Sequence, residues 1–219
     1  MEELPLDVRH ELPGWTLFWA DLELQAGSEA ALGSLRAEVG TRARASHTLE
    51  ALSAHPTAAA VRKLFRQAGC DPTRHRPSSE ALLRRVLKGE ELPAIHPLVD
   101  VNNCLSVELV VPGCVMALGS ATPPFVLRAG REGEAMLSMR GPYELHGKPL
   151  LADAKGPFGT PITDSERVRV GENTNRAWLV AYLPASVLDA SCAREALERL
   201  LAQAPVARVV ATAVSSGVG

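Results

Sequence analysis

Long apolar runs and paired cysteines are both missing from this sequence. No stretch of about 18 uncharged apolar residues occurs among its 219 residues, which excludes a membrane-spanning helix. The four cysteines form no Cys-x-x-Cys pair, which argues against a disulfide framework and against a cysteine zinc site. The acidic first residues lack the basic and then apolar pattern of a signal peptide. We therefore expect a protein of the reducing cytoplasm that has no membrane partner.

Common catalytic and nucleotide-binding motifs are missing as well. The sequence has no Gly-x-x-x-x-Gly-Lys-Ser/Thr, no Gly-x-Gly-x-x-Gly and no Gly-x-Ser-x-Gly. Its six histidines are scattered, and none is spaced from another as in His-x-x-x-His or His-x-x-Glu-His. We therefore expect neither a metal nor a cofactor.

Basic residues are concentrated in one part of the chain. Residues 36–88 hold eleven Lys and Arg against four acidic residues, a net charge of +7. The whole chain has a formal net charge of −2, so the remainder carries −9. A basic segment on an otherwise acidic protein suits a polyanion such as RNA. Solvated helix faces would give the same asymmetry, and charge alone favours that interpretation.

The order of predicted elements indicates an α+β fold. Helices are predicted within 28–54, over 56–68 with Thr57 as cap and Gly69 as stop, over 78–88 and over 191–204. Strands are predicted within 12–24 and over 105–111, 125–128, 135–137, 149–153, 167–170, 177–183 and 206–214. We expect a single domain over 1–219, helix-rich over 28–90 and strand-rich over 97–184, with a C-terminal helix and strand over 186–214.

The first candidate site is a group of polar side chains inside the apolar stretch 95–104. Asn102, Asn103 and Asp100 lie there beside a proline. Amide side chains that are surrounded by apolar chain must find partners or leave groups available for a ligand. A local turn in which these side chains bond their own backbone explains the same residues. The chemistry alone leaves both interpretations open.

The second candidate site is the segment 155–167, which is rich in Gly, Pro and small polar residues. Its irregular backbone, with Gly156 and Gly159, could direct N–H groups at an anion or a developing oxyanion. The alternative is an ordered connection between strands that Asp164 and Ser165 close as a turn, and alone this segment favours that alternative.

Two blocks of the sequence resemble one known family. The first, which starts at His75, is HRPSSEALLRRVLKGEELPAIHPLVDVNNCLSVEL, and the second, which starts at Gly156, is GPFGTPITDSERVRVGENTNRAWLVAYLP. Over roughly residues 74–184 the chain resembles the free-standing B3/B4-domain proteins, which are relatives of the B3/B4 module in the β subunit of bacterial phenylalanyl-tRNA synthetase. The resemblance implies a β-sandwich core with helices packed outside it.

In the synthetase, this module hydrolyses the ester between tRNA and a wrongly attached tyrosine. The resemblance therefore implies a trans-acting hydrolase or binder of aminoacyl-tRNA, without a DNA partner. The residues that it implies for catalysis are Asn103, Asp164 and Ser165. Those that it implies for binding the acyl or ribose group are Asp100, Asn102, Cys114, Gly156, Gly159 and Thr160. Those that we expect to meet tRNA phosphates lie on the basic helices and are Arg62, Lys63, Arg66, Arg84 and Arg85.

The sequence departs from the family's pattern at three positions. Asn103 matches the Asn of the family's Thr-Asn pair, whereas Asn102 replaces the Thr. Cys114 stands in place of the editing histidine, and Val180 in place of a pocket glutamate. These changes leave the amino-acid specificity and the water-orienting group open. They also leave two other functions open: a non-catalytic RNA- or amino-acid-binding module, and a hydrolase of another small ester or amide.

Overall fold

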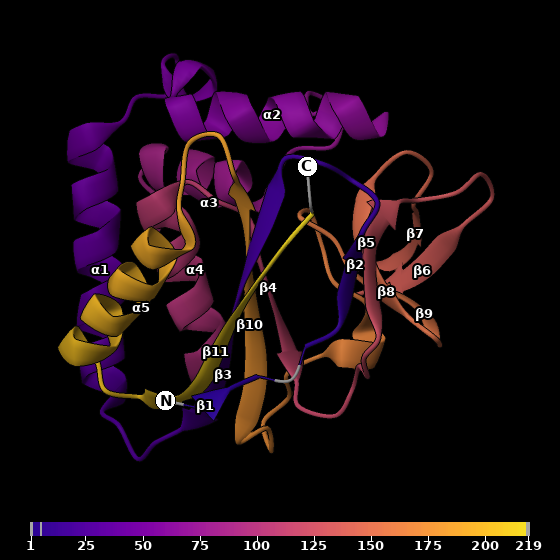
Figure 1. Cartoon of the computed structure of the whole chain (residues 1–219). Helices are drawn as coiled ribbons and strands as arrows, with labels where there is room; N and C mark the ends of the chain where they lie inside the picture. The colour runs from indigo at the N-terminus through magenta and orange to yellow at the C-terminus, as the bar shows by residue number, and fades with distance from the viewer. Residues whose placement is uncertain (1, 5, 218–219) are drawn as a thin grey trace.

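The protein is built on a five-stranded sheet with the strand order β1-β11-β3-β10-β4. The computed structural model, shown in Figure 1, describes residues 2–4 and 6–217. The strands of this sheet are β1 (Glu2–Glu3), β3 (Trp15–Leu24), β4 (Gly113–Ala117), β10 (Arg176–Pro184) and β11 (Ala207–Ser216).

A second sheet faces the first, and a hairpin extends beside it. The second sheet has the order β2-β5-β8-β9, with β2 (Val8–His10), β5 (Phe125–Ala129), β8 (Pro149–Asp153) and β9 (Gly156–Gly159). The hairpin consists of β6 (Ala135–Ser138) and β7 (Gly141–Glu144).

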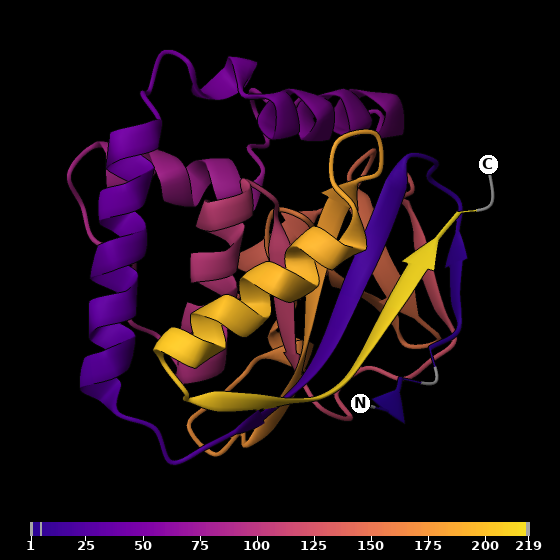
Figure 2. The ribbon, with the colours of Figure 1, turned by 60° about the vertical axis from the view of Figure 1, so that its left-hand side comes forward.

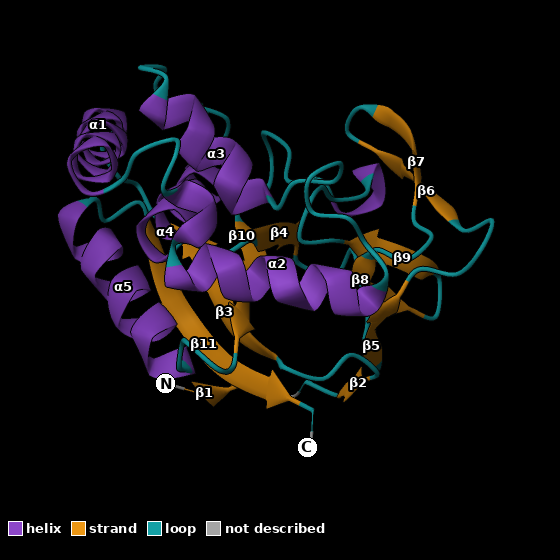
Figure 3. Cartoon of the chain, turned by 90° about the horizontal axis from the view of Figure 1, so that it is seen from above, coloured by secondary structure: helices purple, strands orange, loops and turns teal. Residues whose placement is uncertain are grey.

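Helices cover the face of the five-stranded sheet that points away from the second sheet (Figure 2). They are α1 (Glu29–Ser46), α3 (Ser78–Leu87), α4 (Pro97–Leu109) and α5 (Ala190–Gln203). A further helix, α2 (Pro56–Ala68), crosses above the space between the two sheets (Figure 3). Two short 3-10 helices complete the fold, η1 (Leu52–Ala54) and η2 (Glu166–Val168).

The central strand β3 is buried on both faces. Phe18, Ala20 and Leu22 pack against the helices, whereas Leu17 and Trp19 pack between the sheets. Trp19 stacks on Phe125 of the second sheet, with ring centroids 5.5 Å apart and planes within 7° of parallel. Aromatic stacking of this kind adds to the burial of apolar area. The fold is therefore α+β, with a sandwich-like core and helices outside, as predicted.

The structure corrects three local predictions. Residues 105–111, predicted as a strand, form the second half of α4 and the turn after it. This helix packs against α1, α3, α5 and the sheet, so it is apolar around most of its circumference, and such a run resembles a buried strand in sequence. Residues 167–170, also predicted as a strand, include the end of η2. Thr57 lies inside α2, whose N-cap is His55, whereas Gly69 does cap its end with a φ of +97°.

Candidate functional site

The helix α4 carries Asn102 and Asn103 into the middle of the molecule. A turn at Val110, which has a left-handed φ of +59°, reverses the chain at once into β4. Such a conformation is strained for a β-branched residue, and Val110 holds it with its side chain buried in the core. The reversal places the start of β4 directly against the asparagines. The two asparagines lie on a buried helix and not in a local Asx turn. The alternative of local backbone bonding does hold for Asp100, whose Oδ1 accepts from the Ile95 N–H at 2.9 Å.

Close contact between α4 and β4 depends on Gly113. A Cβ atom added to Gly113 would lie 2.1 Å from Oδ1 of Asn102. A residue without a side chain therefore lets the Asn102 amide lie against the strand. Oδ1 of Asn102 is buried and has no hydrogen-bond partner among the described residues. Buried polar atoms of this kind are rare and call for an explanation, and a bound ligand is one.

The two segments singled out in the sequence line one pocket of about 460 Å³. Asn102 and Asn103 come from α4, Gly113 and Val115 from β4, and Thr163 and Asp164 from the loop after β9. The rest of the lining is Ser78, Ile95, Val99, Met139, Ile162, Glu166, Arg169 and Val170. Segments more than fifty residues apart in the chain thus form a single cleft with mixed polar and apolar walls.

The loop that carries Asp164 is braced by its own hydrogen bonds. The Thr160 hydroxyl donates to the carbonyl of Thr163 at 2.7 Å and accepts from the N–H groups of Ile162 and Thr163 at 3.1 and 2.9 Å. Asp164 then pairs with Gly159 in an isolated antiparallel bridge. The buried Thr160 hydroxyl therefore stabilises the loop and does not line the pocket, because its hydrogen bonds are all made within the loop.

The carboxyl of Asp164 lies beside Cys114 of β4 in a buried environment. Burial raises the pKa of its carboxyl to about 7, although the nearby Cys114 thiol and the backbone N–H groups of Val115 and Thr160 act to lower it. Its Oδ1 is buried and accepts no hydrogen bond of ordinary geometry from the described residues. A carboxyl group with a pKa near neutrality can take or give a proton at physiological pH.

Two further polar groups lie behind Asp164. A Cβ added to Gly159 would lie 3.0 Å from Sγ of Cys114, 3.4 Å from Oδ1 of Asp164 and 3.6 Å from Oη of Tyr182, so these three atoms surround one glycine. Cys114 and Tyr182 are fully buried, and burial raises the pKa of each well above its usual value. The Cys114 thiol is therefore protonated at neutral pH, which makes it a poor nucleophile.

Strand alternation explains why Cys114 is outside the pocket. Gly113 and Val115 of β4 line the pocket, whereas Cys114 points into the core between the sheets. The structure therefore does not bring Cys114 into contact with the cavity, although the resemblance implies that it binds substrate.

Other residues of the predicted set also lie outside the pocket. The Ser165 hydroxyl caps η2 by accepting from the Arg167 N–H at 3.3 Å, and it donates to the carbonyl of Leu137 at 3.2 Å. Asp100 forms an ion pair with Arg36 at 2.5 Å near the start of α4. The Gly156 carbonyl accepts from Arg167 at 3.1 Å. These four contacts hold the protein framework together and leave the predicted roles of the three residues untested.

A basic groove of about 810 Å³ adjoins the pocket. We call it the arginine groove and define it by its charged lining residues and one aromatic residue: Arg76, Arg84, Arg85, Lys88, Glu90, Arg140 and Tyr143. The groove and the pocket share five lining residues: Ser78, Ile95, Asn103, Ile162 and Thr163. A ligand could therefore occupy both hollows at once.

The residues predicted to bind RNA do not all lie in the arginine groove. Arg84 and Arg85 line it. Arg62 is instead paired with the buried Glu80 at 2.9 Å. Lys63 and Arg66 are exposed on α2 and line neither hollow.

The sequence analysis missed several lining residues. Arg76 and Thr163 lie inside the two blocks that resemble the family, so the resemblance could have placed them near the site. Met139, Arg140 and Tyr143 belong to the hairpin between the blocks, where no motif marks them.

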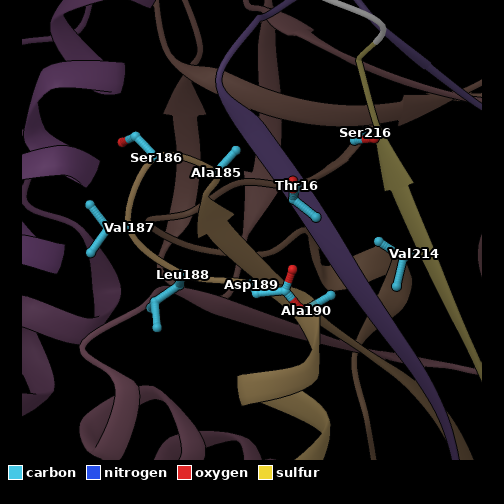
Figure 4. A pocket seen from close by; sticks show the side chains of 9 residues that line it. All are labelled: Thr16, Ala185, Ser186, Val187, Leu188, Asp189, Ala190, Val214 and Ser216. Carbon is cyan, nitrogen blue, oxygen red and sulfur yellow. The ribbon is translucent and has the colours of Figure 1, made fainter.

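Other hollows have less chemistry to offer. The depression in Figure 4, of about 400 Å³, is lined by one titratable side chain, Asp189. That carboxylate is engaged as the N-cap of α5, where it accepts from the Ser191 N–H at 2.7 Å. Over residues 2–4 and 6–217, no group of three or more His, Cys, Asp or Glu is placed to hold a metal ion, and no helix is long and apolar enough to cross a bilayer.

The fold and the site together define a class: an α+β protein in which a basic groove leads into a polar pocket. The chain belongs to the B3/4 domain family, whose pattern matches residues 60–211. Among solved structures it is similar to an N-terminal fragment of the phenylalanyl-tRNA synthetase beta-subunit from Pyrococcus horikoshii, at 13% identity and a TM-score of 0.48. That match covers 93% of this chain and 50% of the other, so this chain spans about half of the fragment. A comparison with curated proteins gives no match.

Proposed function

We propose that this protein hydrolyses the ester bond of wrongly charged aminoacyl-tRNA. The observation that carries the proposal is the junction of the two hollows, where a pocket with a titratable carboxyl at Asp164 opens into the arginine groove. An aminoacyl-tRNA end has the matching parts, an acyl group joined through an ester to a chain of phosphates. Membership of the B3/4 domain family, together with the resemblance to the B3/B4 module of the synthetase, supports the proposal of this substrate class.

In the proposed reaction, Asp164 acts as the general base. Its ionised carboxylate takes a proton from water while the water oxygen attacks the ester carbonyl carbon. The amide groups of Asn102 and Asn103 donate hydrogen bonds to the oxyanion that forms. The bond between the carbonyl carbon and the ribose oxygen then breaks, and Asp164 returns the proton to that oxygen. The products are a free amino acid and tRNA, and the carboxylate is regenerated.

The dimensions and lining of the pocket suit selection by size. A cavity of about 460 Å³ is within the range of small-ligand sites. Its apolar lining includes Ile95, Val99 and Val115, which suits an amino-acid side chain. A synthetase distinguishes similar side chains poorly by binding alone, and a second pocket that removes the wrong one restores accuracy.

A deacylation assay over a panel of mischarged tRNAs tests the proposal. We expect at least one substrate to be hydrolysed, and we expect Asp164→Asn to abolish the turnover and Asn103→Ala to reduce it. Glu166→Gln is the matched control, because Glu166 also lines the pocket but is exposed. The hydrolytic assignment is wrong if Glu166→Gln lowers the deacylation rate as much as Asp164→Asn does. It is also wrong if the unaltered protein cleaves no substrate faster than the Asn103→Ala variant does.

A second candidate function is that of a non-catalytic tRNA- or amino-acid-binding module. It is favoured by the two fully buried residues Cys114 and Val180, which stand where the resembling family has a histidine and a glutamate. This function would give retention of tRNA on a filter without release of the amino acid.

A further inference from the structure

We propose that the arginine groove is a channel for single-stranded RNA in which one base stacks on Tyr143. This inference rests on the proposed function, because it takes the bound polyanion to be the 3′ end of an RNA. It adds the conformation of that RNA and a stacking residue that the sequence analysis did not single out.

The charge of the groove suits a phosphate chain. Its lining holds five basic side chains and one acidic side chain, Glu90. Arg85 is neutralised by Glu90 at 3.0 Å. The remaining four, Arg76, Arg84, Lys88 and Arg140, form no ion pair with any described residue. Arg76 and Arg84 lie close enough to Glu80 to lower the pKa of its carboxyl, but neither is paired with it. Several basic side chains along one groove provide the electrostatic attraction for the backbone of a nucleic acid.

Unsatisfied polar atoms in the groove also point to a ligand. Nε of Arg84 and Oγ of Ser78 are both buried without a hydrogen-bond partner among residues 2–4 and 6–217. Both residues line the groove, and Ser78 also lines the pocket. A phosphate or ribose oxygen would satisfy the guanidinium donor, and the hydroxyl could donate or accept.

Tyr143 is held in a fixed position at the groove. It pairs with Met136 across the β6–β7 hairpin and packs against a small apolar cluster around Leu145 and Leu150. Nζ of Lys148 lies 5.2 Å from the centroid of its ring. A ring that is fixed in this way loses little conformational entropy when a base stacks on it. Burial raises the pKa of the Tyr143 hydroxyl to about 12, so the ring stays neutral beside phosphates.

The size of the groove favours a single strand over a duplex. Its volume of about 810 Å³ is that of a site for a small ligand, which accommodates a few unpaired nucleotides and not a double helix. The five residues that it shares with the pocket give a strand in the groove a route to the site of Asp164. Proteins that bind single strands combine a basic groove with an aromatic stacking surface in this manner.

The test uses the full chain and two uncharged RNA hairpins, one with a four-nucleotide 3′ overhang and one with a blunt end. Fluorescence anisotropy at fixed salt gives the Kd of each. We expect the overhang hairpin to bind more tightly. We expect Tyr143→Leu to weaken its binding by about 5- to 150-fold, the range for the loss of one stacked base. Tyr143→Phe keeps the ring and should bind as the unaltered protein does.

An abasic nucleotide placed at each overhang position in turn separates stacking from any disturbance of the hairpin. At one position the abasic RNA should lose as much affinity as Tyr143→Leu does, and the two changes together should cost no more than either alone. Additive losses at every position, or equal affinity for the blunt hairpin, would overturn the proposal.

The salt dependence of binding tests the phosphate contacts. Arg84→Gln should lower the slope of log K against log salt by about one, because each neutralised phosphate releases about one counterion. Arg194→Gln is the matched control, since Arg194 is exposed on α5 and lines neither the arginine groove nor the pocket. An unchanged slope in Arg84→Gln would contradict the assigned contact.

These experiments distinguish this inference from the proposed function. The RNA carries no ester, so the result does not depend on catalysis. Coupling between the overhang and Tyr143 without deacylation would support the RNA channel and contradict the proposed hydrolase activity. Deacylation without that coupling would support the hydrolase activity and contradict the channel.

Discussion

Relative to the unaltered protein, the Asp164→Asn variant should become more stable as the pH rises. The native pKa of this carboxyl, about 7, lies above its ordinary value of 3.8, because the native environment is buried. The native state therefore holds the proton more tightly than the unfolded chain does. Stability from this group is fully present below pH 3.8 and is lost as the pH rises through 7. A shift of about three units corresponds to roughly 4 kcal/mol.

Asn is a good stand-in for the protonated carboxyl, since it keeps one acceptor oxygen and adds donor hydrogens. Urea unfolding of both proteins at pH 5 and pH 8.5, followed by the fluorescence of the three tryptophans, measures the effect. Between these two pH values, the unfolding free energy of the unaltered protein should fall by about 3 kcal/mol relative to Asp164→Asn. The measured quantity is the change with pH in the difference in unfolding free energy between the two proteins. The titration of groups common to both proteins, and any pH-independent effect of the substitution on stability, cancel in this quantity.

Asp153→Asn provides the control for this measurement. Burial alone would raise the pKa of Asp153, but hydrogen bonds from Arg167 and from backbone N–H groups lower it below the ordinary value. Asp153 is therefore ionised in both states over this pH range, and its removal should leave the pH dependence unchanged. Parallel pH curves for Asp164→Asn and the unaltered protein would refute the assignment of a desolvated carboxyl. The same titration predicts that kcat/KM for deacylation rises with pH through about 7 and levels off above it.

Two further substitutions test the packing around the site. Gly113→Ala would place a Cβ 2.1 Å from Oδ1 of Asn102. We expect it to displace the amide, to lower stability by about 1–3 kcal/mol in urea unfolding, and to raise KM for deacylation; unchanged values of both would show that the contact is not needed. Arg62→Ala would leave the buried Glu80 without its ion-pair partner. It should destabilise the protein by about 3–5 kcal/mol at pH 8 and by less at pH 5, where Glu80 can be protonated; equal losses at the two pH values in thermal unfolding would contradict this account.

The sequence predicted most elements that have a clear local signal. The helix over 56–68 is marked by apolar residues at helical spacing and by Gly69 after its last turn. The strand within 12–24 is marked by alternating large apolar residues, a pattern that predicts burial of one face. The structure buries both faces, because β3 lies at the centre of the sheet between helices and the second sheet. The segment 105–111 gave the wrong prediction because α4 is enclosed by other elements, so its sequence lacks the polar face that identifies a surface helix.

The candidate site was predictable in part. The two blocks quoted for the family resemblance supply Asn103 and Asp164, and the structure places both in one pocket. The position of Cys114 was not predictable, since a shift of one residue in β4 would exchange the faces of the strand. The contributions of Arg140 and Tyr143 depend on the placement of the β6–β7 hairpin beside the groove that α3 also lines, and such long-range placement leaves no local pattern in the sequence.

The position of β3 has a consequence for any shortened form of this protein. The family pattern begins at residue 60, but β3 ends at Leu24 and lies between β11 and β10 in the sheet. A fragment cut to the matched range would lack the middle strand, so two long strands would each expose an unpaired backbone edge. Exposed edges of this kind recruit other chains. Such a fragment should aggregate instead of folding, and the first two dozen residues must accompany the rest in every preparation.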